Sequence, residues 1–147
     1  DIAFDGRNLY AVDVIADVVD QVHQGTGGLS RSFIAPNLNN PHCIATDGRH
    51  LVFGDLTANL ISNINRFGAI HRSYTDPTDL ARSICFDGRN YFIIDNNTDV
   101  IVQLSREMKI VRSAPAPTAD CWGISTDGKY LYVNDQTTDL VYQVCKG

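Results

Sequence analysis

Residues 83–95 read SICFDGRNYFIID, and three further stretches repeat this phrase: DIAFDGRNLYAVD at 1–13, CIATDGRHLVFGD at 43–55 and GISTDGKYLYVND at 123–135. The Asp-Gly pairs of the four copies are 42, 40 and 40 residues apart. An isoleucine stands three residues before each aspartate, and a second aspartate stands eight residues after it. A period near 40 residues is the length of one four-stranded propeller blade. The repeat therefore predicts an all-β architecture.

Each repeat reads as a set of strands separated by turns. The first strands are expected at 2–4, 43–46, 83–86 and 123–126, and Asp-Gly then forms a tight hairpin turn. Largely apolar second strands follow at 9–12, 51–54, 91–94 and 131–134. Third strands are expected at 18–22, 60–64, 100–104 and 140–144. A fourth, outer strand carries Arg31-Ser32-Phe33, Arg72-Ser73-Tyr74 and Arg112-Ser113-Ala114, and the fourth repeat has no such strand.

These strands predict one repeat domain, residues 1–147, with units of about 1–42, 43–82, 83–122 and 123–147. A four-stranded meander is too small to be stable alone, so neighbouring units must cover its apolar faces. We therefore expect a β-propeller-type array of four four-stranded antiparallel blades, the fourth without its outer strand, with a parallel solenoid as the rival geometry. The four isoleucines should be buried at equivalent inner-strand sites: Ile2, Ile44, Ile84 and Ile124.

Composition restricts the partners. Twelve Lys and Arg against seventeen Asp and Glu give a net charge of −5 with no basic cluster, which argues against nucleic-acid binding. The sequence has no apolar run of the roughly 20 residues that cross a bilayer, so no membrane insertion is expected. It begins within repeat sequence without an initiator methionine, which is expected of a processed or partial chain.

The four cysteines share no position in the repeat and form no C-x-x-C motif, so a zinc site is not expected. Three disulfide connectivities are open to them. Asn96-Asn97-Thr98 is a glycosylation sequon in a predicted turn. Together these features favour an extracellular or cell-surface location, with Asn96 as the candidate glycosylation site.

Residues 123–135 resemble the YVTN and NHL-type propeller repeats, whose units read roughly G-I-A-x-D-G-x-x-L-Y-V-x-D. The resemblance extends over the whole chain. It implies a propeller that serves in surface-layer proteins, scaffold domains, lyases or lactonases. Propellers of this superfamily generally carry six to eight blades, so four repeats imply a part of a larger ring or assembly.

Candidate site residues are few. An acidic residue at the end of each second strand could hold a metal ion, although turn formation is the better interpretation: Asp13, Asp55, Asp95 and Asp135. Trp122 could contact a ligand or partner, with packing as the alternative. The histidines share no offset and stand beside no nucleophile, so no catalytic or cofactor-binding residue is expected.

The regular repeats favour a non-enzymatic module for protein–protein or surface interaction, in an oligomeric or extracellular assembly. A carbohydrate- or ligand-binding propeller is the alternative, and a metal-dependent lyase or lactonase is the third hypothesis. The missing outer strand leaves an unpaired edge near Val141 and Val144 that could accept a strand from a copy or from a larger chain. We therefore expect self-association or assembly with another chain, no cofactor, and a glycan as a possible ligand.

Overall fold

The computed structural model describes residues 1–34, 39–78 and 80–146, and these contain fifteen β-strands and no α-helix. The strands form three sheets of four strands and one of three, each an antiparallel meander in chain order. These sheets are the blades of a β-propeller-type fold, as the 40-residue period predicts. In the described part of the chain, no helix is long and apolar enough to cross a membrane.

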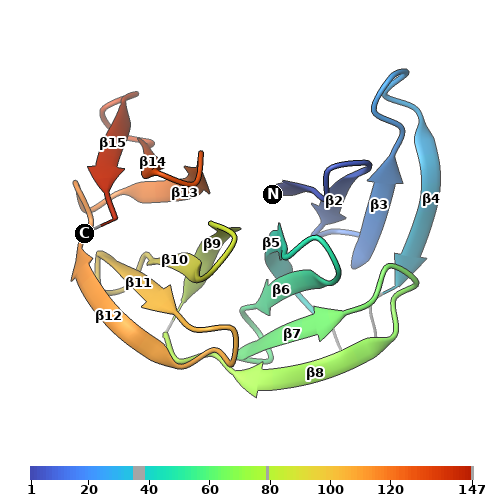
Figure 1. Ribbon diagram of the computed structural model, residues 1–147, viewed down its shortest axis with the longest axis horizontal. Helices are drawn as coiled ribbons and strands as arrows, with labels where there is room; N and C mark the ends of the chain where they lie inside the picture. The colour runs from blue at the N-terminus through green and yellow to red at the C-terminus, as the bar shows by residue number, and fades with distance from the viewer. Residues whose placement is uncertain (35–38, 79, 147) are drawn as a thin grey trace. The chain divides into compact units, whose positions relative to one another are not determined.

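The first two blades form a compact unit, Asp1–Thr75. Blade 1 consists of β1 (Ile2–Phe4), β2 (Leu9–Asp13), β3 (Val18–Val22) and β4 (Leu29–Ile34). Blade 2 consists of β5 (Pro41–Thr46), β6 (Leu51–Asp55), β7 (Leu60–Ile64) and β8 (Ile70–Thr75). In both blades the first strand is at one edge of the sheet and the outer strand, β4 or β8, is at the other (Figure 1).

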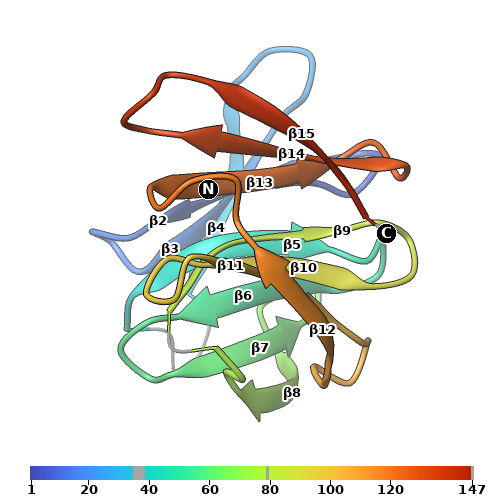
Figure 2. The same ribbon diagram turned by 90° about the vertical axis from the view of Figure 1, so that its left-hand side faces the viewer.

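The second compact unit is Asp76–Gly147. Blade 3 consists of β9 (Ala81–Phe86), β10 (Tyr91–Asp95), β11 (Val100–Leu104) and β12 (Ile110–Pro115). Blade 4 consists of β13 (Cys121–Thr126), β14 (Tyr130–Asp135) and β15 (Val141–Cys145). Figure 2 shows these last three strands as a meander in which β15 is the edge strand.

The Asp-Gly turns close the first hairpin of every blade in the same way. In blade 1, Oδ1 of Asp5 accepts the backbone N–H groups of Arg7 at 2.8 Å and Asn8 at 2.7 Å. Equivalent bonds form at the aspartates of the other three turns, Asp47, Asp87 and Asp127. The glycine that follows each aspartate has φ between 83° and 93°, a conformation that glycine adopts without a steric penalty. The carboxylate thus satisfies backbone donors that the tight turn leaves unpaired.

The second hairpin has a recurring residue in the left-handed conformation. Its φ lies between 52° and 56° at Asp17, Asn59, Asp99 and Asp139. Asp and Asn tolerate this conformation better than other residues with a side chain, which explains why only these two types occupy the position.

Adjacent blades bury a shared core inside each unit. In the first unit, Tyr10 and Val19 of blade 1 pack with Ile44, Leu51 and Phe53 of blade 2. A polar contact crosses the same junction, because the backbone N–H of Ile44 donates to Oδ2 of Asp1 at 3.1 Å. Burial of large apolar side chains between two sheets supplies the stabilisation that one meander lacks.

The second unit repeats this arrangement. Phe92 and Ile101 of blade 3 pack with Ile124, Leu131 and Val133 of blade 4. The backbone N–H of Ile124 donates to Oγ of Ser83 at 3.2 Å. Ser83 occupies the position of Asp1 in its repeat, so both junctions use the side chain before the conserved isoleucine to bind the inner strand of the next blade.

The prediction that all four isoleucines are buried is wrong for Ile2. Ile44, Ile84 and Ile124 are 1%, 3% and 7% exposed, whereas Ile2 is 65% exposed. Neighbouring side chains of a strand point to opposite faces, and blade 2 covers the face of β1 that carries Ala3. Ile2 lies on the opposite face, where the unit Asp1–Thr75 has no further blade.

The first strands of blades 2, 3 and 4 begin two residues before the predicted positions. Pro41 pairs with Asp55, Ala81 with Asp95 and Cys121 with Asp135. A register shift separates each of these pairs from the rest of its ladder. The irregularity extends the pairing as far as the aspartate that ends the second strand.

Candidate interaction site

The four aspartates proposed as weak metal candidates lie at the second hairpin turn of their own blades. Oδ1 of Asp55 accepts the backbone N–H groups of Thr57 at 2.9 Å and Ala58 at 2.8 Å. Corresponding turn bonds form at Asp13, Asp95 and Asp135. Their carboxylates therefore serve as turn-forming acceptors.

Two buried members of this set also hold the loop that precedes the blade's first strand. Oδ2 of Asp55 accepts the backbone N–H of Asn39 at 2.6 Å and of Asn40 at 3.2 Å. The second carboxylate oxygen of Asp135 accepts the hydroxyl of Thr118. In the described ranges, no three His, Cys, Asp or Glu side chains group closely enough to hold a metal ion.

Trp122 lies on β13 in contact with blade 3. The guanidinium of Arg82 lies 3.4 Å from the centroid of the indole ring, and the indole N–H donates to Oδ1 of Asp120 at 2.9 Å. Trp122 remains 38% exposed. Its cation–π contact stabilises the junction of these two blades, and its role in ligand binding stays a prediction.

Asn96, the predicted glycosylation site, is half-buried in the second hairpin of blade 3. Its Nδ2 donates to the backbone carbonyl of Cys121 at 3.0 Å. Nδ2 is also the atom that would carry a glycan, and after modification it would keep a single N–H for this hydrogen bond. The location of the protein and this modification stay predictions.

All four cysteines are free thiols in the structure. Cys43, Cys85 and Cys121 are buried, and Cys145 is exposed on β15. Burial, with a smaller contribution from Asp87, raises the pKa of the Cys85 thiol to about 12. Cys145 is therefore the thiol with the readiest access to solvent.

The edge strand β15, which carries Val141 and Val144, is the most distinctive feature of blade 4. Its equivalents β3, β7 and β11 are each paired on both sides, with β4, β8 and β12 as their outer neighbours. Among the described residues, β15 pairs only with β14. The side chain of Val141 is exposed and that of Val144 is half-buried.

The direction of the free backbone groups on β15 follows from one hydrogen bond. Asp135 N–H donates to Leu140 C=O at 3.0 Å, so Leu140 bonds toward β14. Backbone groups alternate in an antiparallel ladder, so Tyr142 and Val144 also bond toward β14, whereas Val141 and Gln143 present theirs to the open side. In blade 3 the equivalent residues, Ile101 and Gln103, lie opposite Ala114 and Arg112 of the outer strand.

A groove with a volume of about 210 Å³ adjoins this edge, between blade 3 and β15. Blade 3 supplies Phe92, Ile101 and Ala114, with Gln103, Arg112 and Ser113 on the same wall. Blade 4 supplies the facing wall, Leu131 with Val144–Lys146. The site thus combines free backbone donors and acceptors with an apolar depression beside them.

The groove has a local cause in the sequence. Phe33 lies opposite Val19 in blade 1, and Ala114 lies opposite the equivalent Ile101 in blade 3. Phe33 packs against the core shared by blades 1 and 2. Its ring also comes close to the β7–β8 hairpin, where a Cβ added to Gly68 would lie 2.9 Å from the ring. Blade 4 has no described outer hairpin, and Ala114 has no ring, so the corresponding space is open.

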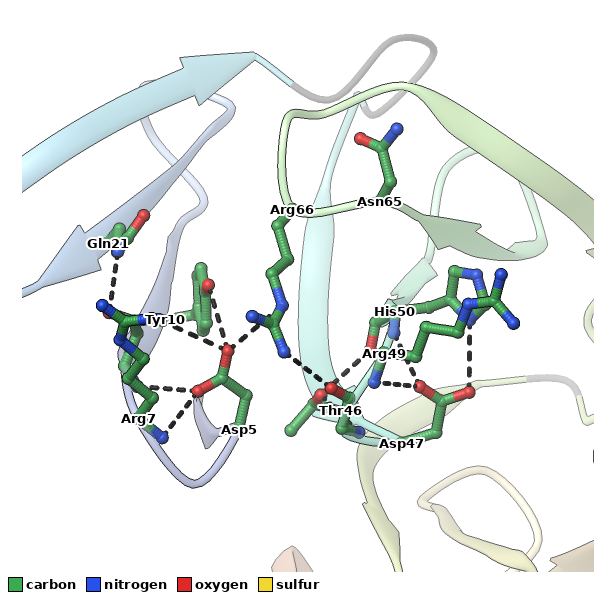
Figure 3. Close-up of polar contacts among 12 residues, drawn as sticks. Asp5, Arg7, Tyr10, Gln21, Thr46, Asp47, Arg49, His50, Asn65 and Arg66 are labelled. Carbon is green, nitrogen blue, oxygen red and sulfur yellow. Dashed lines mark hydrogen bonds and ion pairs between the residues drawn. The ribbon is translucent and has the colours of Figure 1, made fainter.

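A basic residue links the Asp-Gly turns of the two blades inside each unit. In the first unit, Nε of Arg66 lies 3.4 Å from Oδ2 of Asp5, and Nη2 of Arg66 donates to the carbonyl of Gly48 at 2.7 Å (Figure 3). Arg66 therefore links the turn of blade 1 to the turn of its own blade. The Asp5 side chain is 1% exposed, and Tyr10 O–H also donates to it at 3.3 Å.

The second unit has the equivalent clamp. Nζ of Lys146 lies 2.7 Å from Oδ2 of Asp87 in blade 3 and donates to the carbonyl of Gly128 in its own blade. Each of these basic residues stands 18 positions after the glycine of its Asp-Gly pair, as does Arg106 of blade 3. Arg106 donates to the carbonyl of Gly88 at 3.0 Å.

This position, Arg66, Arg106 and Lys146, was missed by the sequence reasoning. The signal was available, because a basic residue recurs there in three repeats, with Gln24 in the first. Its meaning depends on the neighbouring blade, which a single repeat does not reveal.

The pKa values of the turn aspartates Asp5 and Asp87 are lowered. Burial alone would raise the pKa of Asp5, but backbone N–H donors from Asn8 and Arg7 and the charge of Arg66 outweigh it and lower the pKa below 3.8. In Asp87, burial is likewise outweighed by the backbone of Asn90 and by Lys146, and the pKa is lowered. Both carboxylates are therefore ionised at neutral pH.

Comparison with known proteins gives the fold. No protein-family model and no curated protein matches the sequence. The chain is similar to the glutaminyl cyclase of Myxococcus xanthus, with a TM-score of 0.82 and 11% identity over 98% of this chain and 64% of that one. A virginiamycin B lyase from Staphylococcus aureus gives 0.72 and 20% over 97% and 50%. A chain of a nidogen–laminin complex gives 0.75 and 22% over 98% and 58%.

These likenesses support a β-propeller fold. At such identities they show the fold alone, and the chain spans between half and about two thirds of the length of these three proteins. They include a cyclase, a lyase and a component of a protein complex, and propellers host many unrelated functions. A conclusion about function must therefore rest on the geometry of the site.

Proposed function

We propose that this chain is a non-enzymatic β-propeller module for protein–protein interaction, in which β15 accepts a strand from a copy or from a larger chain. One observation carries the proposal: among the described residues the outer edge of β15 pairs with no strand, and an apolar groove adjoins it. An unpaired strand edge recruits an extended segment through backbone hydrogen bonds, and neighbouring pockets add side-chain specificity. Val141 and Gln143 offer the backbone groups, and the groove lies directly beside them.

The non-enzymatic part of the proposal rests on how the recurring polar residues are used. The Asp-Gly carboxylates accept turn N–H groups in all four blades. The aspartates of the second hairpin do the same. The same residue types thus perform the same structural task in every repeat, whereas a catalytic site requires one repeat to depart from the others.

The test uses a synthetic peptide of residues 69–75, the outer strand of blade 2, as a generic partner strand for residues 1–147. Binding is measured by fluorescence anisotropy with a labelled peptide. Gln143→Pro removes one outward N–H from β15 and should weaken binding at least about tenfold. Gln143→Thr keeps the N–H and is the matched control, which should bind as the unaltered chain does. Equal affinity of the proline and threonine variants would contradict docking at β15.

A further inference from the structure

We propose that His50 and His71 of blade 2 form a binding site for a divalent transition-metal ion of the class that prefers imidazole nitrogen, with Zn²⁺ as the probe. The site lies within one blade and is separate from β15, so the inference does not rest on the proposed function.

The two imidazole rings lie face to face. His50 follows the Asp-Gly turn between β5 and β6, and His71 belongs to β8. Their ring centroids are 4.8 Å apart, and the ring planes differ by 10°. A zinc ion lies about 2.0–2.1 Å from each nitrogen that binds it. His71 is exposed, so a rotation of its side chain is enough to bring both rings to one ion.

Asp47 holds His50 in the tautomer that a metal ion requires. Nδ1 of His50 lies 3.3 Å from Oδ2 of Asp47 (Figure 3). A carboxylate at one ring nitrogen is the usual partner of a metal-binding histidine, because it fixes the ring and leaves the lone pair of the other nitrogen available. Nε2 of His50 is therefore the atom that would bind the ion.

His71 stands at an irregularity of the β7–β8 ladder. Asn63 lies opposite Arg72 and Ile64 lies opposite Ile70, so β8 has one residue more than β7 at this point, and His71 is the extra residue. Such a β-bulge re-aims a side chain, and bulges are over-represented next to functional sites. Here the bulge accompanies the placement of the His71 ring against that of His50.

Blade 2 departs from the other repeats at both positions. The other blades have different residues there: Asn8, Asn90 and Tyr130 in place of His50, and Ser30 and Val111 in place of His71. Blades 1 and 3 have the same bulge in their outer strands. The backbone thus belongs to the repeat, whereas the pair of imidazoles is specific to blade 2, as a binding site in one repeat requires.

An unpaired oxygen lies on the same face of the sheet. Oδ1 of Asn63 is buried and has no hydrogen-bond partner in the described structure. Asn63 lies opposite Val52, which is two residues after His50 and shares its face. In blade 1 the equivalent side chains are in contact, because Nε2 of Gln21 donates to Oδ1 of Asn8 at 2.9 Å. A water molecule on the ion would thus find an acceptor in Asn63.

The number of ligands predicts the type of site. In the described ranges no third His, Cys, Asp or Glu completes a metal-binding group with these two histidines. Water must therefore occupy the remaining coordination positions. A structural zinc site has four protein ligands, so the ion bound here should be exchangeable and folding should not require it.

Isothermal titration calorimetry with ZnCl₂ tests the site. The parent chain is residues 1–147 with Cys145→Ser, so that the exposed thiol does not compete for the ion. One Zn²⁺ should bind per chain. His50→Asn and His71→Val should each weaken binding at least about tenfold, and both introduce the residue that another repeat carries at that position. His23→Asn removes an exposed histidine of blade 1 and is the control, which should bind as the parent does.

NMR of the histidine rings gives a second readout on the parent chain. Zn²⁺ should shift the ring resonances of His50 and His71 and leave those of His23 and His42 unchanged. This measurement decides the question even where a variant does not fold. Absence of binding at about 1 mM Zn²⁺ would overturn the inference. Weakening by neither replacement, or by only one, would show that the two rings do not share an ion.

Discussion

Arg66 and Asp5 join two blades that are otherwise linked mainly by apolar packing. Nε of Arg66 lies 3.4 Å from the buried Oδ2 of Asp5, and the same guanidinium donates to the carbonyl of Gly48. Lys146 and Asp87 reproduce this relationship at 2.7 Å in the second unit. The recurrence indicates that the clamp helps to hold together the two blades of each unit.

Arg66→Ala should therefore lower the free energy of unfolding by about 0.5–1.5 kcal/mol, since it removes a hydrogen bond and a partly exposed ion pair. Arg49→Ala removes an exposed basic side chain from a turn of the same blade and should change stability by less than about 0.5 kcal/mol. Urea denaturation of both variants measures the difference. Equal losses would mean that Arg66 does not act as a clamp.

Ile84→Ala should cost about 2–5 kcal/mol, because a large buried side chain leaves a cavity. Ile2→Ala, at the equivalent but exposed position, should cost less than about 0.5 kcal/mol. The same denaturation assay compares the pair. A cost below about 0.5 kcal/mol for Ile84→Ala would show that the burial assigned to this strand is wrong.

Stability should fall in acid. The folded-state pKa values of Asp5, Asp47 and Asp87 are lowered, so these groups stabilise the folded state above the unfolded aspartate pKa of about 3.9, and this contribution is lost as the pH falls through the folded values. Asp76 has the opposite sign, because burial raises its pKa and protonation favours the folded state.

The pKa is also lowered at Asp13, Asp127 and Asp135, so the lowered values should outweigh the single raised aspartate and the urea midpoint should decrease between about pH 5 and about pH 3. Asp87→Asn should lessen this decrease, because it removes one titrating carboxylate of the set. A midpoint that is constant over this interval would contradict the assigned shifts.

Cys145 should react with thiol reagents faster than the other three cysteines. Cys145 is exposed, so one thiol per chain should react rapidly with Ellman's reagent under native conditions. Cys43, Cys85 and Cys121 are buried and should react only after unfolding, to a total of four. Cys145→Ser should remove the rapid phase. Fewer than four thiols in denaturant, without reductant, would instead indicate disulfide formation.

Much of the fold was predictable because the residues that form a turn are neighbours in the sequence. The Asp-Gly pair specifies a tight hairpin through its own carboxylate and glycine, and the repetition of Asp87 and its equivalents fixed the blade length. The exposure of a side chain depends instead on the blades that pack against its own blade. Ile2 and Ile44 occupy the same position in their repeats, and only the presence of an adjacent blade buries one of them.

The site was partly predictable for the same reason. The unpaired edge at Val141 and Val144 followed from counting strands, and the structure shows β15 paired on one side only within the described residues. The groove was not predicted, although Ala114 stands where two other repeats have Phe33 and Tyr74. The consequence of that difference depends on the blade that faces it, which lies outside the repeat itself.

Amide hydrogen exchange on β15, followed by NMR, tests strand docking most directly. In residues 1–147 alone, the N–H groups of Val141 and Gln143 should exchange rapidly, while those of Tyr142 and Val144, bonded toward β14, should be protected. Saturation with the 69–75 peptide should slow exchange at Val141 and Gln143 specifically. If the peptide binds while both amides continue to exchange rapidly, β15 is not the docking edge and the account is contradicted.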